Sequence, residues 1–118
     1  MEIVTTERDN VVVLSLKGRL DFSSSTSLKE RVGEMMNEGR RHFVINMAQV
    51  DFINSSGLGT LVSVLKEVRL AKGRMVLANL GTYVQEIFEI TQLSHIFEIC
   101  ESEEEAMTAV QATPATVN

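Results

Sequence analysis

Cysteine, proline and aromatic residues are scarce in this sequence, and their scarcity excludes several classes of protein. The 118 residues include one cysteine, one proline and no tryptophan, and only 5% are aromatic. The single cysteine, Cys100, cannot form a disulfide within the chain, so nothing indicates an oxidising compartment. The first residues lack the basic and apolar regions of a secretory signal, and no apolar run approaches the ~18 residues of a membrane helix. These absences predict a cytoplasmic protein with no membrane association.

Basic residues are also few. Eleven Lys and Arg stand against sixteen Asp and Glu, which gives a formal net charge of -5. Proteins that bind nucleic acid usually carry a basic face, and Arg40-Arg41 is the only basic pair in the sequence. His42 and His95 have no further ligand at a spacing suited to a metal ion. We therefore expect no direct nucleic-acid binding, no metal and no other cofactor.

Length and composition are those of one globular domain. Hydrophobic residues make up 44% of the chain and charged residues 23%. A chain of this size buries roughly two-thirds of its unfolded surface, so it can fold without disulfides. Residues 111–118 are small and polar and include the only proline, so we expect a disordered tail there and a domain over residues 1–110.

Apolar periodicity predicts an N-terminal hairpin followed by alternating strands and helices. Asp9-Asn10 separates two strand-like runs and has the chemistry of a tight turn. In chain order the pattern predicts strands at 2–8 and 11–20, a loop at 21–27, a helix opened by a capping box of Ser27 and Glu30, a strand at 43–47, a helix at 55–72, a strand at 75–78, a helix opened by Thr82 and Gln85, a strand at 96–99 and a helix opened by Ser102 and Glu105. Because strand and helix alternate, we expect parallel pairing. The expected fold class is α/β, with a mixed, mostly parallel sheet of about five strands, an N-terminal hairpin and about four helices.

The most informative stretch lies between the predicted central strand and the long helix that follows it. In open α/β sheets, ligands and reactive groups gather where a strand ends and the next helix begins. Asn54, Ser55 and Ser56 are each suited to cap this helix. Gly57 and Gly59 fall in its first turns, where each costs ~1 kcal/mol relative to alanine. Two explanations stay open: close packing of the helix on a strand, or approach of another molecule to the backbone.

A phosphate on Ser55 or Ser56 would act on a bound partner and not on the fold. The N-terminus of a helix favours anions by about 0.3–2 kcal/mol, so the helix should not unfold. The phosphate adds about -1.5 to -2 charge at pH 7. Against one carboxylate about 6 Å away, the repulsion is ~1 kcal/mol in bulk water and ~5 kcal/mol at an effective dielectric of about 20. Such a charge is sufficient to switch binding without refolding.

Several segments together resemble one known family. Asn54-Ser55-Ser56-Gly57-Leu58-Gly59 resembles the signature of STAS domains, above all the bacterial anti-sigma factor antagonists, whose usual form is Asp-Ser-Ser-Gly-Leu-Gly after an apolar strand. Gly18-Arg19-Leu20-Asp21 resembles the family's Gly-Glu-Leu-Asp after the second strand. The resemblance extends from the first hairpin to about Val110 and implies a single STAS domain.

The resemblance implies a regulatory cycle in which this chain is a substrate and not an enzyme. An anti-sigma factor with serine kinase activity would phosphorylate Ser55. The unphosphorylated form would bind that partner and release a sigma factor. Phosphorylation would end the binding, and a metal-dependent serine phosphatase would reset the protein. The residues expected to contact the partner are Asp21, Asn54, Ser55, Ser56, Gly57, Leu58 and Gly59.

The sequence departs from the family pattern at three positions. Asn54 and Asn46 stand where the family usually has Asp, and Arg19 stands where it has Glu.

Other functions for the two serines find less support in the sequence. A catalytic serine is disfavoured because neither Ser55 nor Ser56 lies in a Gly-x-Ser-x-Gly elbow. A phosphate-binding loop is disfavoured because the glycines lack the lysine of a P-loop. The alternative that stays open is a STAS scaffold subunit of a stress-signalling or lipid-transport assembly, in which the serine is silent.

Overall fold

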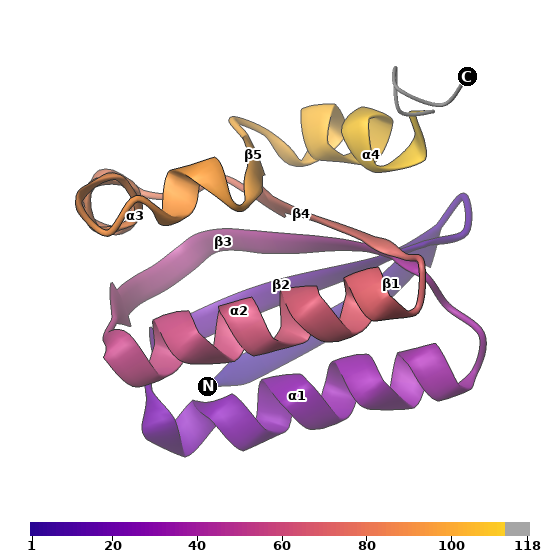
Figure 1. Ribbon diagram of the computed structural model, residues 1–118, viewed down its shortest axis with the longest axis horizontal. Helices are drawn as coiled ribbons and strands as arrows, with labels where there is room; N and C mark the ends of the chain where they lie inside the picture. The colour runs from indigo at the N-terminus through magenta and orange to yellow at the C-terminus, as the bar shows by residue number, and fades with distance from the viewer. Residues whose placement is uncertain (113–118) are drawn as a thin grey trace.

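The structure is a computed structural model that describes residues 1–112 (Figure 1). Within these residues five strands form one sheet in the order β1-β2-β3-β4-β5, accompanied by four α-helices and one short 3-10 helix. The elements are β1 (Glu2–Arg8), β2 (Val11–Leu20), α1 (Phe22–Asn37), β3 (His42–Ile53), α2 (Ser55–Leu70), β4 (Arg74–Ala78), α3 (Thr82–Ile90), η1 (Leu93–His95), β5 (Glu98–Cys100) and α4 (Glu103–Gln111). The predicted fold class is confirmed.

The hairpin and the parallel pairing both follow the sequence pattern. β1 and β2 pair antiparallel, and the two residues between them, Asp9 and Asn10, have φ angles of 54° and 66°. Two positive φ angles in a two-residue loop define a type I′ turn, whose twist matches that of the strands. The pairs β2-β3, β3-β4 and β4-β5 are all parallel. The carboxyl ends of β2, β3 and β4 therefore meet at one edge of the sheet, and α1, α2 and α3 each begin there.

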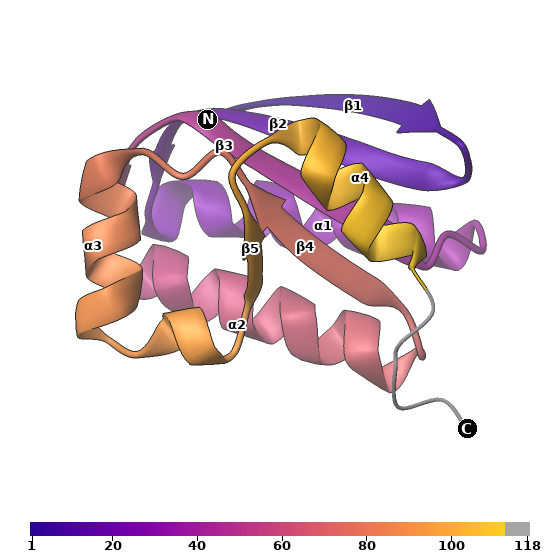
Figure 2. The same ribbon diagram turned by 90° about the horizontal axis from the view of Figure 1, so that it is seen from above.

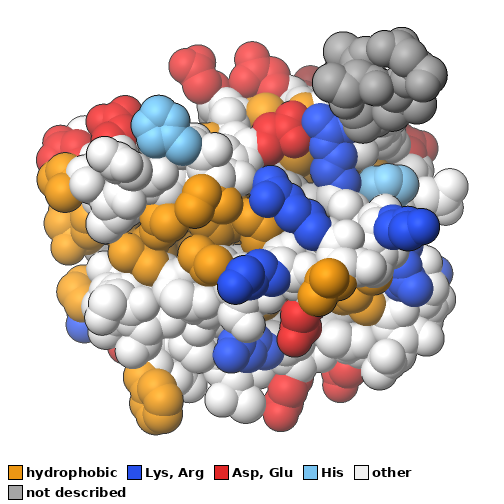
Figure 3. Space-filling model, in the orientation of Figure 1, with side chains coloured by type: hydrophobic (Ala, Val, Ile, Leu, Met, Phe, Trp, Pro, Cys, Tyr) orange, Lys and Arg blue, Asp and Glu red, His pale blue; other side chains and the backbone are white. Residues whose placement is uncertain are grey.

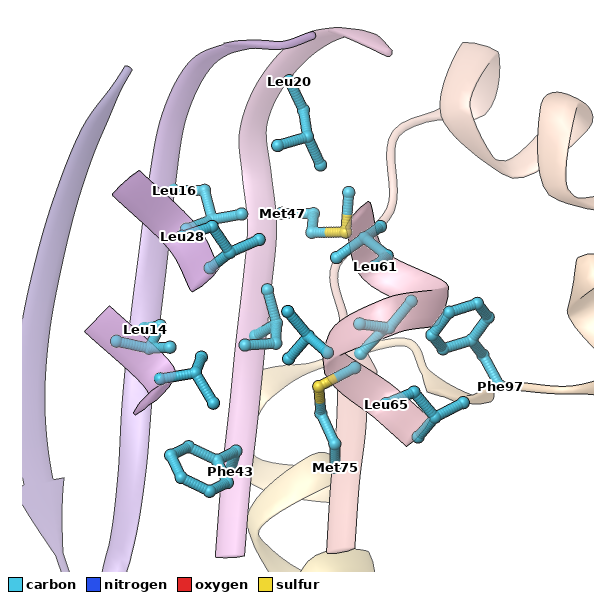
Figure 4. Packing of buried hydrophobic residues seen from close by; sticks show 14 of the residues in the cluster. Leu14, Leu16, Leu20, Leu28, Phe43, Met47, Leu61, Leu65, Met75 and Phe97 are labelled. Atoms are coloured by element: carbon cyan, nitrogen blue, oxygen red, sulfur yellow. The ribbon is translucent and has the colours of Figure 1, made fainter. Parts of the chain in front are cut away.

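The helices form two layers around the sheet. α1 and α2 cover one face and α4 covers the other, while α3 lies beside the carboxyl ends of the strands (Figures 1 and 2). β3 contributes side chains to both faces, since Phe43 and Ile45 pack on the α1–α2 side and Val44 on the α4 side. Figure 4 shows the larger cluster, which includes Leu14, Leu16, Leu28, Met47, Leu61, Leu65 and Met75. β3 is therefore a central strand that is buried on both faces of the sheet.

β3 is longer than the apolar run that predicted it. The strand has twelve residues, His42–Ile53, whereas the apolar run predicted only 43–47. Its second half pairs with the end of β2, up to Leu20 opposite Ile53. Ala48, Gln49 and Asp51 are exposed and interrupt the apolar run, although Val50 and Ile53 in this half are buried. Pairing with β2 extends β3 to the edge where α2 begins.

Three predicted boundaries in the C-terminal half also shift. α2 ends at Leu70, two residues before the predicted end at 72. β5 is Glu98–Cys100 and not 96–99, because Leu93–His95 forms a 3-10 helix that delays the strand. α4 ends at Gln111, one residue past the predicted domain end, and the Gln111 amide donates to the Asp9 carbonyl oxygen at 3.1 Å. The rest of the predicted tail, from residue 113, lies outside the described residues.

The two later capping boxes differ from prediction. α3 is capped by Gly81 without a side-chain hydrogen bond, so the Thr82–Gln85 box is wrong. Ser102 does cap α4, because its hydroxyl accepts from the backbone N–H of Glu105 at 3.1 Å. The Glu105 carboxylate accepts from the backbone N–H of Glu101 at 3.1 Å, which is not the reciprocal bond of the box. Half of the third box is therefore confirmed.

Candidate functional site

Asn54 caps the helix that carries the two serines. Its backbone is extended, and its side-chain oxygen accepts from the N–H of Gly57 at 3.0 Å. Its carbonyl oxygen accepts from the N–H of Leu58 at 2.9 Å. Ser55 and Ser56 are then the first two helical residues, and both are exposed. Of the three residues suited to cap α2, the structure selects Asn54 and leaves both hydroxyls at the surface.

The two glycines after the serines have different surroundings. Gly57 is buried, and a Cβ atom there would overlap the carbonyl oxygen of Leu20 and lie 2.8 Å from its carbonyl carbon. Gly59 is exposed, and a Cβ atom there would meet nothing within 4 Å. Close packing of α2 on the end of β2 therefore explains Gly57, which lies beneath the surface. Close packing does not explain Gly59, where the absence of a side chain leaves the backbone of α2 exposed.

Asp21 begins α1 at the same edge of the sheet. Its carboxylate accepts from the backbone N–H of Ser23 at 3.1 Å, and the hydroxyl of Ser24 accepts from the backbone N–H of Asp21 at 2.9 Å. The predicted loop at 21–27 and the Ser27–Glu30 box are therefore wrong. A search for Ser or Thr followed by Glu or Gln misses this cap, because Asp and Ser fill the two places.

Hydrogen bonding keeps the Asp21 carboxyl ionised. The hydroxyl of Ser23 donates to it at 2.7 Å and is the largest cause that lowers its pKa below the ordinary value. The backbone N–H groups of Ser23 and Ser24 act in the same direction. At neutral pH the start of α1 therefore carries a negative charge beside the start of α2.

Arg19 lies between an aromatic ring and the Asp21 carboxylate. Its guanidinium carbon is 3.9 Å from the ring centroid of Phe52, and its Nε is 3.6 Å from the Asp21 carboxylate. A cation over an aromatic ring at an exposed site contributes about 0.5–1 kcal/mol. Arg19 reaches Phe52 because the two residues are opposite each other in the β2–β3 pairing. Arg19 therefore places a positive charge at the edge where α1 and α2 begin, and its contacts with Phe52 and Asp21 hold the guanidinium there.

The starts of α1 and α2 are also bonded to each other. The hydroxyl of Thr60 donates to the hydroxyl of Ser25 at 2.6 Å and to the carbonyl oxygen of Ser56 at 2.9 Å. Next to this contact, Phe22 is the first residue of α1 and is 80% exposed. Exposed aromatic residues are frequent anchors of protein interfaces. The sequence reasoning missed Phe22 because it placed this segment in a loop.

A family model describes this arrangement as a STAS domain and matches residues 2–106. The chain belongs to the STAS domain family.

Relatives of this STAS domain include anti-sigma factor antagonists. BtrV of Bordetella bronchiseptica, named as a proposed anti-sigma factor antagonist, is 28% identical over 109 residues, which cover 92% of this chain and 94% of BtrV. TM1081 of Thermotoga maritima, named in the same way, has a crystal structure with a TM-score of 0.87 and 25% identity, covering 93% of this chain and 95% of TM1081. The anti-sigma factor antagonist SpoIIAA in its unphosphorylated form has a TM-score of 0.74 at 22% identity, with 95% of this chain and 100% of SpoIIAA covered.

Asn46 serves the STAS fold on the other side of the sheet. Its amide nitrogen donates to the Glu103 carboxylate of α4 at 2.9 Å, and its side-chain oxygen accepts from the N–H of Ala48 at 2.9 Å. An aspartate at this position would set two carboxylates against each other. The amide therefore matches Glu103, and this departure from the family's usual Asp links β3 to α4.

The described part of the STAS domain holds neither a metal-binding cluster nor a membrane-spanning helix. Among residues 1–112, no three His, Cys, Asp or Glu side chains come together in a way that could hold a metal ion. None of the helices in these residues is long and apolar enough to cross a membrane. Burial raises the pKa of the Cys100 thiol, so this cysteine is a poor nucleophile.

Substitutions at Asn54 should separate capping from charge. We expect Asn54→Ala to lower the free energy of unfolding by ~1 kcal/mol, because the N–H of Gly57 loses its acceptor. Asn54→Asp keeps an acceptor and adds a charge that the helix start favours, so stability should stay the same or rise by about 0.3–1 kcal/mol. Urea denaturation measures both changes. Equal losses for Ala and Asp would contradict the capping role.

Proposed function

We propose that this STAS domain is an anti-sigma factor antagonist controlled by phosphorylation of Ser55. In its unphosphorylated form it binds an anti-sigma factor with serine kinase activity and so releases a sigma factor. Phosphorylation abolishes the binding, and a serine phosphatase that acts on the phosphorylated form restores it. The chain is a substrate in this cycle, catalyses no reaction and needs no cofactor or direct contact with nucleic acid. The cycle runs in the bacterial cytoplasm.

The observation that carries the proposal is the position of Ser55. Ser55 is exposed and is the first residue of α2, whose start is capped by Asn54 and lies beside the start of α1. Family membership and the names of the relatives support the antagonist role. Exposure alone does not separate Ser55 from Ser56, and the family signature favours the first serine of the pair.

The other serines near this edge are less suited to phosphorylation. Ser24 is only 4% exposed, and its hydroxyl donates to the carbonyl oxygen of Arg19. Ser25 is half-buried and accepts from Thr60. A kinase must reach the hydroxyl oxygen, so of the serines at 23–25 only Ser23 competes with Ser55 in exposure.

The proposed partner surface combines residues with distinct roles. Asp21 and Asn54 set the starts of α1 and α2 by capping them. Ser55, Ser56 and exposed Gly59 offer polar groups and bare backbone, and half-buried Leu58 offers an apolar contact. Gly57 acts from beneath, because it brings α2 close to β2. A band of hydrophobic side chains is visible in Figure 3 between α2 and α3, next to this surface.

Phosphate mapping tests the proposal directly. Incubated with ATP and a kinase-type anti-sigma factor from the same genome, the protein should gain one phosphate on Ser55. Ser56→Ala should still be phosphorylated, whereas Ser55→Ala should not, and mass spectrometry reads both results. A phosphate found on Ser56 or Ser23 would show that the phosphorylation site is that serine and not Ser55. No phosphate on a protein that still binds the partner would favour a scaffold subunit whose serine is silent.

A further inference from the structure

Basic residues that are separated in the sequence meet at the edge of the sheet opposite Ser55. Six of the eleven Lys and Arg lie in two segments, 40–41 and 66–74: Arg40, Arg41, Lys66, Arg69, Lys72 and Arg74. His42 pairs with Arg74 in the β3–β4 register, and the N–H of Arg74 donates to the carbonyl oxygen of Arg41 at 2.8 Å. Parallel pairing thus joins the two segments at the amino ends of β3 and β4, beside the C-terminal end of α2.

Two of these six charges are neutralised by ion pairs within the protein. Arg40 forms an ion pair with Glu7, and Arg74 forms one with Glu98 at 3.0 Å. Among residues 1–112, Lys66, Arg69 and Lys72 form no ion pair. In Figure 3, Lys and Arg side chains form a band over the C-terminal half of α2 and beyond it. We call Lys66, Arg69, Leu70 and Lys72 the basic surface.

An exposed leucine lies within the basic surface. Leu70 is 84% exposed, and together with Lys66 and Arg69 it lines a shallow, mostly apolar hollow. Cations in the last turn of a helix offset its dipole, which accounts for Arg69 without any partner. Helix stability gives no reason for an exposed leucine beside two cations that form no ion pair among residues 1–112. The combination is suited to a ligand that carries both carboxylates and an apolar group.

We propose that the basic surface is a second docking site, which binds an acidic segment of a partner protein. Carboxylates of the segment pair with Lys66, Arg69 and Lys72, and one of its apolar side chains packs on Leu70. Charge complementarity favours this occupant, since no carboxylate among residues 1–112 forms an ion pair with the three cations and, of their side chains, only that of Arg69 has a hydrogen bond, to the carbonyl oxygen of Ile96 at 3.0 Å. Nucleic acid is disfavoured because the net charge of -5 repels a long polyanion.

The basic surface is far enough from Ser55 to act independently. Fifteen helical steps separate Ser55 from Leu70, which is about 22 Å along α2. Charges at the protein surface are largely screened beyond about 8 Å at physiological ionic strength. Phosphorylation of Ser55 should therefore leave this site unchanged, so the protein can hold one partner at the basic surface while the other site switches.

A synthetic acidic peptide is a suitable probe, because it carries the proposed chemistry. A fluorescent peptide of three Glu-Glu-Leu-Glu repeats should bind the full-length protein, and its affinity should fall as salt rises. The double variant Lys66→Glu, Arg69→Glu should bind at least fivefold more weakly. Leu70→Ser, which changes no charge, should bind at least twofold more weakly. Ser55→Asp should bind as tightly as the wild type.

A charge-matched variant serves as the control. Lys17→Glu with Lys29→Glu changes the net charge by the same amount at exposed positions elsewhere, and it should bind within twofold of the wild type. Thermal melting checks that every variant is folded. The proposal is overturned if the wild type does not bind the peptide, or if the control loses as much affinity as the Lys66 and Arg69 variant. It is also overturned if an oligothymidine of equal charge binds as tightly and Leu70→Ser has no effect, since the surface would then be a general anion site.

Discussion

Ser55→Asp is expected to weaken binding of the anti-sigma factor at least tenfold while the protein stays folded. One added charge facing a partner carboxylate about 6 Å away costs roughly 3 kcal/mol at an effective dielectric of about 20, and tenfold corresponds to about 1.4 kcal/mol. The same charge is favoured at the start of α2, where Ser55 is the first residue. Calorimetry should therefore show a weaker affinity for the partner, while thermal melting should show no loss of stability.

Three further variants define what a Ser55→Asp result means. Ser55→Ala should bind the partner and resist phosphorylation. Ser27→Asp adds the same charge at an exposed position later in α1 and should bind as the wild type does. Asp21→Asn retains a side-chain oxygen for the cap and removes the charge, so weaker binding at unchanged stability would assign Asp21 to the partner surface. Asp21→Ala cannot make this distinction, because it also removes the cap of α1.

Two outcomes would reject the electrostatic switch. If Ser55→Asp binds as tightly as the wild type, charge at this position does not control the partner. If Ser55→Asp unfolds, phosphorylation would have to act through the structure, and the scaffold alternative would gain support. Both outcomes leave the basic surface untouched, because its peptide test does not depend on Ser55.

Gly57→Ala is expected to be the most destabilising small substitution at the site, with a loss of about 3 kcal/mol in the free energy of unfolding. The added methyl group would overlap the backbone carbonyl of Leu20, which is fully buried at the end of β2. Overpacking against side chains typically costs about 1–3 kcal/mol, and a backbone carbonyl held in a sheet yields less than a side chain.

Gly59→Ala is the matched control for this substitution. Both glycines lie in α2, but a methyl group on Gly59 meets nothing within 4 Å. Alanine is a better helix former than glycine, so Gly59→Ala should stabilise the protein by about 0.5–1 kcal/mol. Urea denaturation of the two variants gives the comparison. Similar changes in both would mean that helix propensity, and not the contact with Leu20, decides their effect.

Short-range patterns in the sequence determined the class of fold and the location of the site. The hairpin follows from Asp9-Asn10, because two residues that tolerate positive φ between apolar runs specify a type I′ turn. Alternating apolar strands and helices after it determined the parallel sheet. The start of α2 at Ser55 followed from cap residues next to a periodic apolar helix. Each of these signals acts between neighbours in the chain, so the order of residues carries it.

Only the tertiary structure decided which atoms meet across the sheet. The end of β2 lies against α2, and this contact distinguishes buried Gly57 from bare Gly59 although both read alike in the sequence. Pairing with β2 extends β3 past exposed Gln49, where the continuous apolar run of the sequence is interrupted. The amino ends of β3 and β4 join Arg41 and Arg74, so the basic segments 40–41 and 66–74, which are distant in the sequence, lie side by side. The physical reason is the same in each case: steric contact and charge act over a few ångströms in space, whatever the separation along the chain.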